Sequence, residues 1–329
     1  FSIRGCISNS QHGFVSGRST STNLTSMSQF IADTLDNKSQ LDVIYTDLSK
    51  AFDTIDHQLL LFKLSSIGFS ELLIKLIASY LSSRLNLVMC NGFISNSYIS
   101  TSGVPQGSVM GPLLFIIYIN DVVEVIKNSH ILMYADDIKI FRKIESPDDC
   151  LLLQMDLENI QQWCIANCLL LNHKKCKVVT YSLCQNLCQY VYYVENYPLE
   201  RLRSVKDLGV YYDSEYSFRV HVNNVVLSAG KILGFMLRNC KDFNNISTLT
   251  VLYNALVRSR LEYCSLAWFP YYYNQTHQIE NVQRRFLKCL YFKEEGSWPY
   301  RNYSHFELLK RYKFSTLHSR RVANALIFI

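Results

Sequence analysis

Three carboxylates stand where folding can bring them together. Asp136 and Asp137 are adjacent between two short apolar runs, and Asp47 directly follows an apolar, β-branched run over residues 41–46. Two carboxylates about 4 Å apart repel each other by roughly 4 kcal/mol at an effective dielectric constant of 20. A cation between them removes that repulsion, and oxygen ligands without His or Cys favour Mg²⁺ or Mn²⁺. Such ions support phosphoryl transfer, although an Asp-Asp pair alone is also ordinary turn chemistry.

The elements that position these acids are expected to be a strand, a helix and a hairpin. Residues 41–46 predict a strand, and the apolar spacing from Phe52 onward predicts a helix after a tight turn. Apolar runs over 131–134 and 138–141 predict a β-hairpin with residues 135–137 at its turn. Further helices are expected over 72–80, 112–125, 151–169 and from residue 220 onward, and further strands over 85–90, 97–101, 178–182 and 205–212.

Composition narrows the class of protein. The chain has 329 residues, of which 49% are hydrophobic, so it can bury a sizeable core and is not intrinsically disordered. Its longest apolar run, 109–119, is well short of the roughly 20 residues that span a bilayer, and we expect no membrane partner. The eleven cysteines are predicted to be reduced thiols. The pairs Cys164/Cys168 and Cys184/Cys188 lack a matching His pair and are a weak zinc signal.

Charge is distributed unevenly along the chain. Residues 1–150 carry 11 Lys and Arg against 14 Asp and Glu, whereas residues from Arg219 onward carry 16 against 6. This division predicts a carboxylate site joined to a surface for a polyanion, with a solvated basic helical face as the alternative. Arg284, Arg285 and Lys288 lie off the apolar stripe of their predicted helix, and we expect them to bind nucleic acid.

Several motifs in a fixed order resemble one family. Tyr134-Ala135-Asp136-Asp137 resembles the Y-x-D-D signature of reverse transcriptases, Asp47–Asp53 resembles their first acidic motif, and Gly103–Phe115 resembles the G-V-P-Q-G-S motif between them. Weaker matches are found at 11–14 with 17–20, 171–175, 207–210, 256–263 and 279–284. The chain therefore resembles the non-LTR (LINE-like, jockey-type) retrotransposon reverse transcriptases over nearly its whole length.

The resemblance implies an α/β (α+β) right-hand polymerase fold. The expected parts are a remnant of the fingers over 1–40, a palm with an antiparallel sheet and interspersed fingers helices over 41–215, and a helical, basic thumb with the following region over 216–329. Because the chain starts close to the motif at 11–14, we expect an N-terminally truncated fragment with only partial fingers. We see neither an endonuclease domain nor a zinc-knuckle motif in the sequence, so the fragment alone is not expected to cleave a target site.

The resemblance also implies roles for individual residues. Asp47, Asp136 and Asp137 would be the catalytic acids and, with the carbonyl of Leu48, the metal ligands. Phe52 would be a steric gate against the 2′-hydroxyl, with a core phenylalanine as the alternative. The remaining roles are nucleotide and template-base binding by Gln106 and Gly107, triphosphate binding by Arg18, pyrophosphate departure assisted by Lys175, and a primer grip at Leu208, Gly209 and Val210.

The function implied is RNA-directed DNA synthesis by a nucleotidyltransferase. The expected cofactor is Mg²⁺ or Mn²⁺, and the expected partners are an RNA template, a DNA primer or nicked target DNA, and dNTPs. The expected location is intracellular, in the nucleus during target-primed synthesis or in a cytoplasmic ribonucleoprotein. One alternative is a catalytically inactive or co-opted remnant that binds nucleic acid. Another is a Mg²⁺-dependent nuclease or phosphatase, which leaves the motifs between and after the acids unexplained.

Overall fold

The computed structural model describes residues 5–184, 186–300 and 303–328, and the chain forms two compact units. The first ends at Arg203 and the second begins at Ser204. The second unit opens with a hairpin of β12 (Ser204–Asp207) and β13 (Val210–Asp213), and β13 packs on the following helix, α6 (Arg219–Asn239). The fingers, palm and thumb bounds that the family resemblance implies stay predictions.

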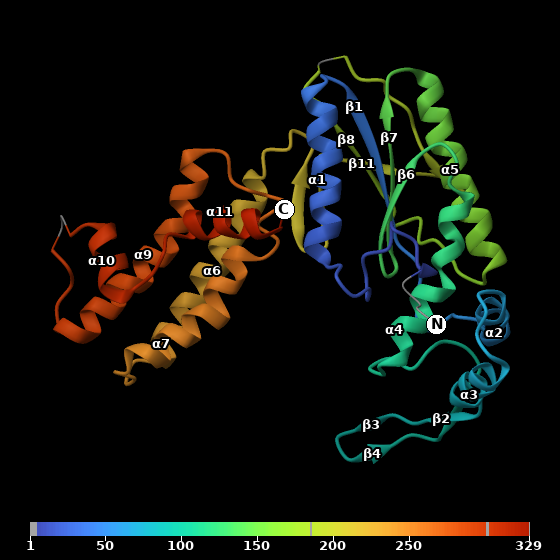
Figure 1. Ribbon diagram of the computed structural model, residues 1–329, viewed down its shortest axis with the longest axis horizontal. Coiled ribbons are helices and arrows are strands. Elements are labelled where there is room, and N and C mark those ends of the chain that lie inside the picture. The colour runs from blue at the N-terminus through green and yellow to red at the C-terminus, as the bar shows by residue number, and fades with distance from the viewer. Residues whose placement is uncertain (1–4, 185, 301–302, 329) are drawn as a thin grey trace. The chain divides into compact units, whose positions relative to one another are not determined.

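A five-stranded sheet forms the centre of the first unit, with the order β11-β8-β1-β7-β6 (Figure 1). Its strands are β1 (Gln40–Thr46), β6 (His130–Tyr134), β7 (Asp137–Ile144), β8 (Lys177–Tyr181) and β11 (Glu200–Leu202). Every neighbouring pair is antiparallel except β11 with β8. The predicted antiparallel sheet is confirmed, with one short parallel strand added at its edge.

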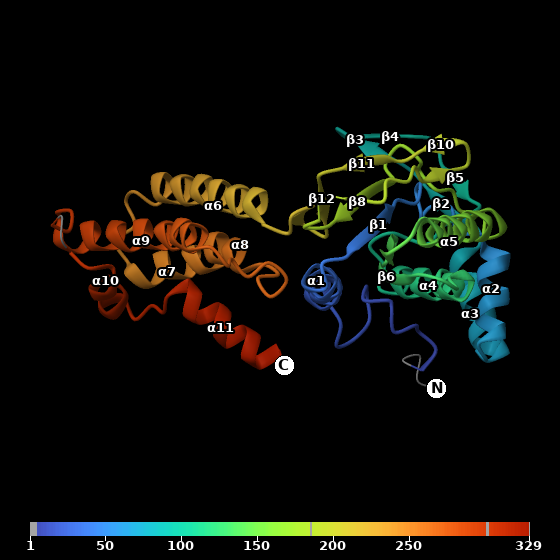
Figure 2. The ribbon, with the colours of Figure 1, turned by 90° about the horizontal axis from the view of Figure 1, so that it is seen from above.

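Helices cover both faces of this sheet. Figures 1 and 2 show α1 (Thr20–Asp36) on one face and α5 (Pro147–Ala166) with α4 (Met110–Tyr118) on the other. Val43 pairs with Phe141, whose ring lies 4.9 Å from that of Phe30 on α1. Ile44 pairs with Ile140, and both belong to the apolar core on the α5 side. The alternation of side chains along each strand therefore buries both faces.

Two predicted helices begin or end elsewhere than expected. The helix predicted from Phe52 starts instead at His57, because the Asp56 side chain caps it by accepting a hydrogen bond from the Leu59 amide at 2.8 Å. The helix predicted over 112–125 ends at Tyr118 and continues as a 3₁₀ segment, η2 (Asn120–Val125). The other elements of this unit are α2 (His57–Ser66), α3 (Glu71–Leu81), β2 (Arg84–Asn86), β3 (Met89–Cys90), β4 (Phe93–Ile94), β5 (Tyr98–Ser100), β9 (Tyr193–Val194) and β10 (Tyr197–Pro198).

A fully buried carboxylate, Asp42 on β1, joins distant parts of the first unit. It accepts hydrogen bonds from the Thr180 hydroxyl on β8 at 2.7 Å and from the Tyr192 hydroxyl at 2.9 Å. Arg201 Nη1 on β11 lies 3.3 Å from the same carboxylate and also bonds Thr180 Oγ1. Gln40 Nε2 donates to the same carboxylate at 3.0 Å. Since a buried charge is tolerated only when it is paired and hydrogen-bonded, Asp42 needs these partners in place.

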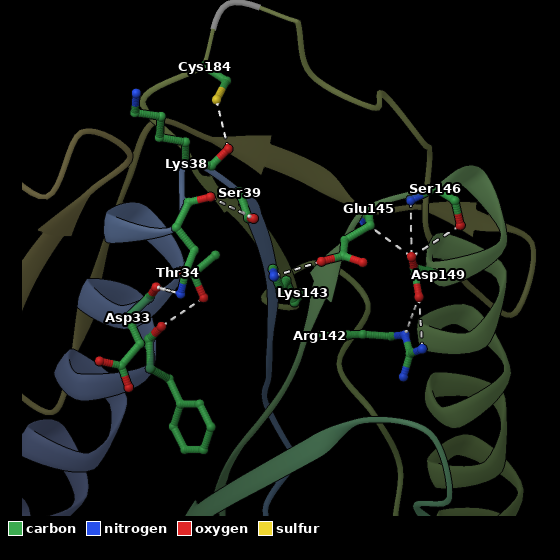
Figure 3. Close-up of polar contacts among 12 residues, drawn as sticks. Asp33, Thr34, Lys38, Ser39, Arg142, Lys143, Glu145, Ser146, Asp149 and Cys184 are labelled. Atoms are coloured by element: carbon green, nitrogen blue, oxygen red, sulfur yellow. Dashed lines mark hydrogen bonds and ion pairs between the residues drawn. The ribbon is translucent and has the colours of Figure 1, made fainter.

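Polar contacts fix α5 at the end of the sheet where β7 finishes (Figure 3). Asp149, in the first turn of α5, accepts hydrogen bonds from Arg142 Nε at 3.0 Å and Nη2 at 2.8 Å. The Asp149 carboxylate also accepts from the backbone and the hydroxyl of Ser146, which begins the helix. Because Asp149 bonds both a strand residue and the helix start, it holds α5 against β7.

The second unit is helical after its opening hairpin. Its remaining elements are α7 (Ile246–Tyr253), the π-turn segment η3 (Asn254–Arg258), α8 (Ser259–Glu262), α9 (Tyr273–Glu295), α10 (His305–Tyr312) and α11 (Leu317–Phe328). Helix α6 packs on α9, and the predicted apolar stripes of both helices are buried. Among the described helices, α6 alone is long and apolar enough to cross a membrane, which is weak evidence because core helices share these properties.

Candidate active site

The sheet brings the predicted acids to one edge. Asp47 directly follows β1, and Asp136 and Asp137 lie at the turn between β6 and β7. Thr46 pairs with Ile138 across the two neighbouring strands, so the acids follow in register at the same end. Ala135 has a φ of 53°, in the left-handed region that a two-residue hairpin turn requires. The tight turn therefore places Asp136 beside the end of β1.

Asp47 and Asp136 share an electrostatic environment that suits a cation. Burial and the neighbouring Asp47 carboxylate raise the pKa of Asp136, while a backbone hydrogen bond and Lys175 act in the opposite direction. Lys175 Nζ lies 3.3 Å from both carboxylate oxygens of Asp47. Asp47 Oδ2 is buried and accepts no hydrogen bond from the described residues, so its contact with Lys175 is an ion pair alone. A backbone hydrogen bond and an exposed lysine thus offset part of the repulsion between two close carboxylates.

Asp137, the third predicted acid, is more exposed than Asp136. Asp137 is exposed, and the described residues contain no group of three His, Cys, Asp or Glu side chains positioned to hold a metal. Leu48 is buried and pairs with Leu171, and the Asn172 amide donates to the Asp47 carbonyl at 2.8 Å. This pairing fixes the backbone that carries Asp47. The metal-binding roles of Asp137 and of the Leu48 carbonyl stay predictions.

The loop that contains Gln106 docks against the segment after Asp47. The Val104 amide donates to the Phe52 carbonyl at 2.9 Å, and Gln106 Nε2 donates to Asp53 Oδ1 at 2.7 Å. A Cβ atom on Gly103 would lie 2.7 Å from the Asp53 carbonyl oxygen, so only glycine allows this approach. The Phe52 ring stacks on Phe115 at a centroid distance of 4.1 Å. The structure therefore brings the first acidic motif and the G-V-P-Q-G-S motif together.

The nearby Gly107 has a φ of 81°, and a Cβ atom there would meet no other atom within 4 Å. Its neighbour Ser108 closes the loop, because its hydroxyl donates to the Pro105 carbonyl at 2.7 Å and accepts from the Gly111 amide at 2.9 Å. Gly107 thus presents bare backbone toward open space, as the predicted nucleotide contact requires.

Two residues that hold the acidic turn in place were not singled out from the sequence. Gln11 is fully buried, and its Oε1 accepts from the Ala135 amide at 2.9 Å and from the Gly13 amide at 2.8 Å. A Cβ atom on Gly13 would lie only 2.4 Å from the Ala135 nitrogen. Gln11 and Gly13 therefore position the turn that carries Asp136. The motif at 11–14 resembles the family and could have indicated both residues, but it predicted no role for either of them.

Arg18 has its donors occupied by a loop of the first unit. Its Nη1 donates to the carbonyls of Ser8 and Gln11 at 2.8 and 2.6 Å, and its Nη2 donates to Asn9 Oδ1 at 2.7 Å. In this arrangement the guanidinium supports the segment that contacts the acidic turn. Triphosphate binding by Arg18 stays a prediction and would require some of these bonds to open.

The remaining predicted residues lie in the second unit. Leu208 and Gly209, with φ values of 43° and 91°, form the turn between β12 and β13, and Val210 begins β13. Arg284, Arg285 and Lys288 lie on α9, where Arg285 is exposed and the other two are half-buried. The roles of the turn at 208–210 and of these basic side chains stay predictions.

Residues 3–228 match the profile of the family described as "Reverse transcriptase (RNA-dependent DNA polymerase)". The chain belongs to the reverse transcriptase family. The chain is 30% identical over 226 residues to the RNA-directed DNA polymerase from mobile element jockey of Drosophila funebris, covering 65% of this chain and 24% of the relative. It is 25% identical over 287 residues to the probable RNA-directed DNA polymerase from transposon X-element of Drosophila melanogaster, covering 85% and 31%.

These relatives are the polymerases of non-LTR retrotransposons, as the motifs predicted, and the chain spans about a quarter to a third of their length. Among solved structures, the chain resembles apo telomerase from Candida tropicalis with a TM-score of 0.51 and 10% identity. That match covers 94% of this chain and 51% of the telomerase chain. It supports the polymerase palm fold. Reverse transcriptases as a family use divalent metal ions.

Proposed function

We propose that this chain contains the active site of an RNA-directed DNA polymerase of a non-LTR retrotransposon. The reaction would join a primer 3′-hydroxyl to the α-phosphate of a dNTP on an RNA template, with release of pyrophosphate. The observation that carries the proposal is the meeting of Asp47 and Asp136 at one sheet edge, where Asp136 has a raised pKa. Further support comes from relatives that are named as RNA-directed DNA polymerases.

Asp47 and Asp136 fit a divalent cation because the two carboxylates lie close together and one buried Asp47 oxygen accepts no hydrogen bond from the described residues, its contact there being the ion pair with Lys175. We assign Mg²⁺, with Mn²⁺ as a substitute, to these two acids, together with Asp137 and the Leu48 carbonyl. When bound, the metal would lower the pKa of the attacking hydroxyl and stabilise the charge on the leaving group. Lys175, now 3.3 Å from Asp47, would then be released to neutralise the departing pyrophosphate.

Phe52 and Gln106 would select the incoming nucleotide. The stack on Phe115 holds the Phe52 ring in one place, as a steric gate against a 2′-hydroxyl requires. Gln106 is held by Asp53, and its amide oxygen remains available to accept a hydrogen bond from a base or sugar. Phe52 lies five residues after Asp47, and Gln106 reaches the same segment through its hydrogen bond to Asp53, so the positions of both depend on this sheet edge.

The remaining assignments complete the proposal. Residues 1–40 would belong to the fingers, 41–215 to the palm and 216–329 to the thumb and the following region. The turn at 208–210 would contact the primer, and Arg284, Arg285 and Lys288 would contact phosphates of the template or primer. The partners would be an RNA template, a DNA primer or target DNA, and dNTPs. The location would be intracellular, in the nucleus during target-primed synthesis or in a cytoplasmic ribonucleoprotein.

Primer extension on poly(rA)/oligo(dT) with Mg²⁺ tests the proposal. The wild-type chain should extend the primer, and the double variant Asp136→Asn/Asp137→Asn should not. Asp148→Asn is a matched control, because Asp148 is an exposed acid in the first turn of α5, outside the site. Salt-sensitive binding of the hybrid without any extension by the wild type would support the non-catalytic remnant instead.

A further inference from the structure

Two cysteines of the first unit lie close together beside the sheet. Cys150 is fully buried in the first turn of α5, and Cys188 is half-buried in the segment before β9. Their Sγ atoms are 3.7 Å apart, although 38 positions separate the two residues in the sequence. The sulfurs of a disulfide lie about 2.05 Å apart, so the two side chains need to approach each other by about 1.7 Å to become bonded. The pair is therefore placed for a covalent bond that requires only a small movement.

Hydrogen bonds hold the backbone of both cysteines in place. The Cys188 amide donates to Gln40 Oε1 at 2.8 Å, and Gln40 Nε2 donates to the Cys188 carbonyl at 2.9 Å. Cys150 directly follows Asp149, which fixes the start of α5 through its bonds to Arg142. Gln40 begins β1 and Arg142 lies on β7, so both sulfurs are anchored to the same pair of strands. This anchoring gives the two thiols a high effective concentration toward each other.

The structure pairs Cys188 with Cys150 and not with Cys184, its neighbour in the C-x3-C spacing. Cys184 is exposed, and its thiol donates to the Lys38 carbonyl at 3.0 Å (Figure 3). The part of the chain that the structure describes contains no group of three His, Cys, Asp or Glu side chains positioned for a metal. Within that part, Cys150 and Cys188 form a dithiol and do not belong to a larger set of metal ligands.

The two thiols differ in their access to solvent. Burial raises the pKa of the Cys150 thiol to about 11, while the Tyr192 hydroxyl acts in the opposite direction, so Cys150 is protonated at neutral pH. Cys188 reaches the surface in part, and oxidants attack the sulfur that they can reach. An oxidant therefore meets Cys188 first, and Cys150 is the thiol that can bond to it afterwards.

We propose that hydroperoxides convert Cys150 and Cys188 reversibly into a disulfide that joins α5 to the segment before β9. With hydrogen peroxide, the Cys188 sulfur attacks one oxygen, the O–O bond breaks, and water leaves while Cys188 becomes a sulfenic acid. The Cys150 sulfur then attacks the Cys188 sulfur and the S–O bond breaks. The leaving hydroxide takes the Cys150 thiol proton and becomes water. The two thiols lose two electrons in total, one hydrogen peroxide becomes two waters, and a dithiol reductant returns the two electrons and two protons.

The disulfide would act on the stability of the first unit. It closes a loop that contains most of α5 and the whole of β8. Such a cross-link removes conformations from the unfolded chain and thereby stabilises the folded one. Cys188 is bonded to Gln40 at the start of β1, whereas Asp47 follows the end of that strand, so the acids need not move when the bond forms.

Peptide mapping of the full chain tests which cysteines bond. The protein is treated with hydrogen peroxide, its remaining thiols are alkylated, and it is digested with Asp-N and trypsin without reduction. These enzymes release Cys150 as the only cysteine of residues 149–155, and release Cys184 with Cys188 in residues 178–201. We expect the two peptides to be linked in wild type and in the control Cys184→Ala, and unlinked in Cys188→Ala and after treatment with dithiothreitol. Absence of the link in wild type would overturn the proposal, as would a link that Cys184→Ala removes or that dithiothreitol leaves intact.

Thermal melting measures the consequence of the bond. Each protein is compared with its own reduced form, so a change in stability caused by the substitution itself cancels. Oxidation should raise Tm by about 5–10 °C in wild type and Cys184→Ala, and by less than about 2 °C in Cys150→Ala and Cys188→Ala. An equal rise in Cys188→Ala, or no rise in a wild-type chain whose two peptides are linked, would refute the stabilising role. Neither measurement requires polymerase activity, so a chain inactive in primer extension can still pass or fail both.

Discussion

Replacing Gly13 by alanine should disturb the acidic turn from a position that touches no substrate. The added Cβ atom would lie 2.4 Å from the Ala135 nitrogen and 3.1 Å from the Tyr134 carbonyl carbon, whereas such contacts essentially never fall below 3.0 Å. Both neighbours are backbone atoms, so the turn or the 11–13 segment must move by roughly 0.6 Å. Overpacking of this kind destabilises a protein by about 1–3 kcal/mol. A misplacement near 1 Å at a reacting centre reduces the rate by about 100-fold.

We therefore expect Gly13→Ala to lower the rate of primer extension by about 10- to 100-fold. Urea unfolding should show a loss of about 1–3 kcal/mol, and the variant should still bind the hybrid when folded. Gly5→Ala is the matched control, because a Cβ atom at Gly5 would meet no atom within 4 Å. If Gly13→Ala behaved like Gly5→Ala in both assays, the contact between this segment and the turn would not position Asp136.

Three further changes have defined outcomes. Phe52→Val should raise incorporation of ribonucleotides relative to deoxyribonucleotides by about 10- to 100-fold in single-nucleotide extension, and unchanged sugar selectivity would refute the steric gate. Because burial and Asp47 raise the pKa of Asp136, its contribution to stability declines as the pH rises above the usual value of 3.8. Asp136→Asn should accordingly raise Tm at pH 7 in EDTA while abolishing extension; an unchanged or lower Tm would contradict this. Arg321 is fully buried 5.6 Å from the Trp268 ring, with no hydrogen bond from its guanidinium to any described residue. Arg321→Met should raise the free energy of unfolding by about 1–4 kcal/mol in urea titrations, and a decrease would show that the guanidinium is paired through water.

The sheet edge could be predicted because its pattern is local. The apolar run that ends before Asp47 and the paired runs on either side of Ala135 define two strand ends, and β1, β6 and β7 form there. A hairpin must place its turn residues at one end of its strands, which fixes Asp136, whereas the pairing of β1 with β7 that brings Asp47 there joins residues 92 positions apart. The order of the motifs then connected this edge to a polymerase family.

The supporting contacts could not be predicted because they join residues far apart in the sequence. Gln11 and Ala135 are separated by 124 positions, and no local periodicity reports their hydrogen bond. The start of the helix after Asp47 was misplaced because Phe52 fits a helical spacing, yet its carbonyl accepts from the Val104 amide of a later loop. Lys175 was predicted to contact a phosphate. Its ion pair with Asp47 joins residues that are 128 positions apart in the sequence. Tertiary contacts of this kind override local preference.

The buried Asp42 also determines when the first unit can finish folding during synthesis of the chain. Its charge partner Arg201 is made 159 residues later, so the sheet cannot neutralise this carboxylate until almost the whole first unit has left the ribosome. At about 5–20 residues per second, that delay is roughly 8–32 s. During this interval β1 must remain solvated or unfolded, because an unpaired carboxylate resists burial. Formation of the ion pair between Asp42 and Arg201 is therefore a late step in the folding of the first unit. A chain that stops before Arg201 would leave its apolar strands exposed to aggregation or proteolysis.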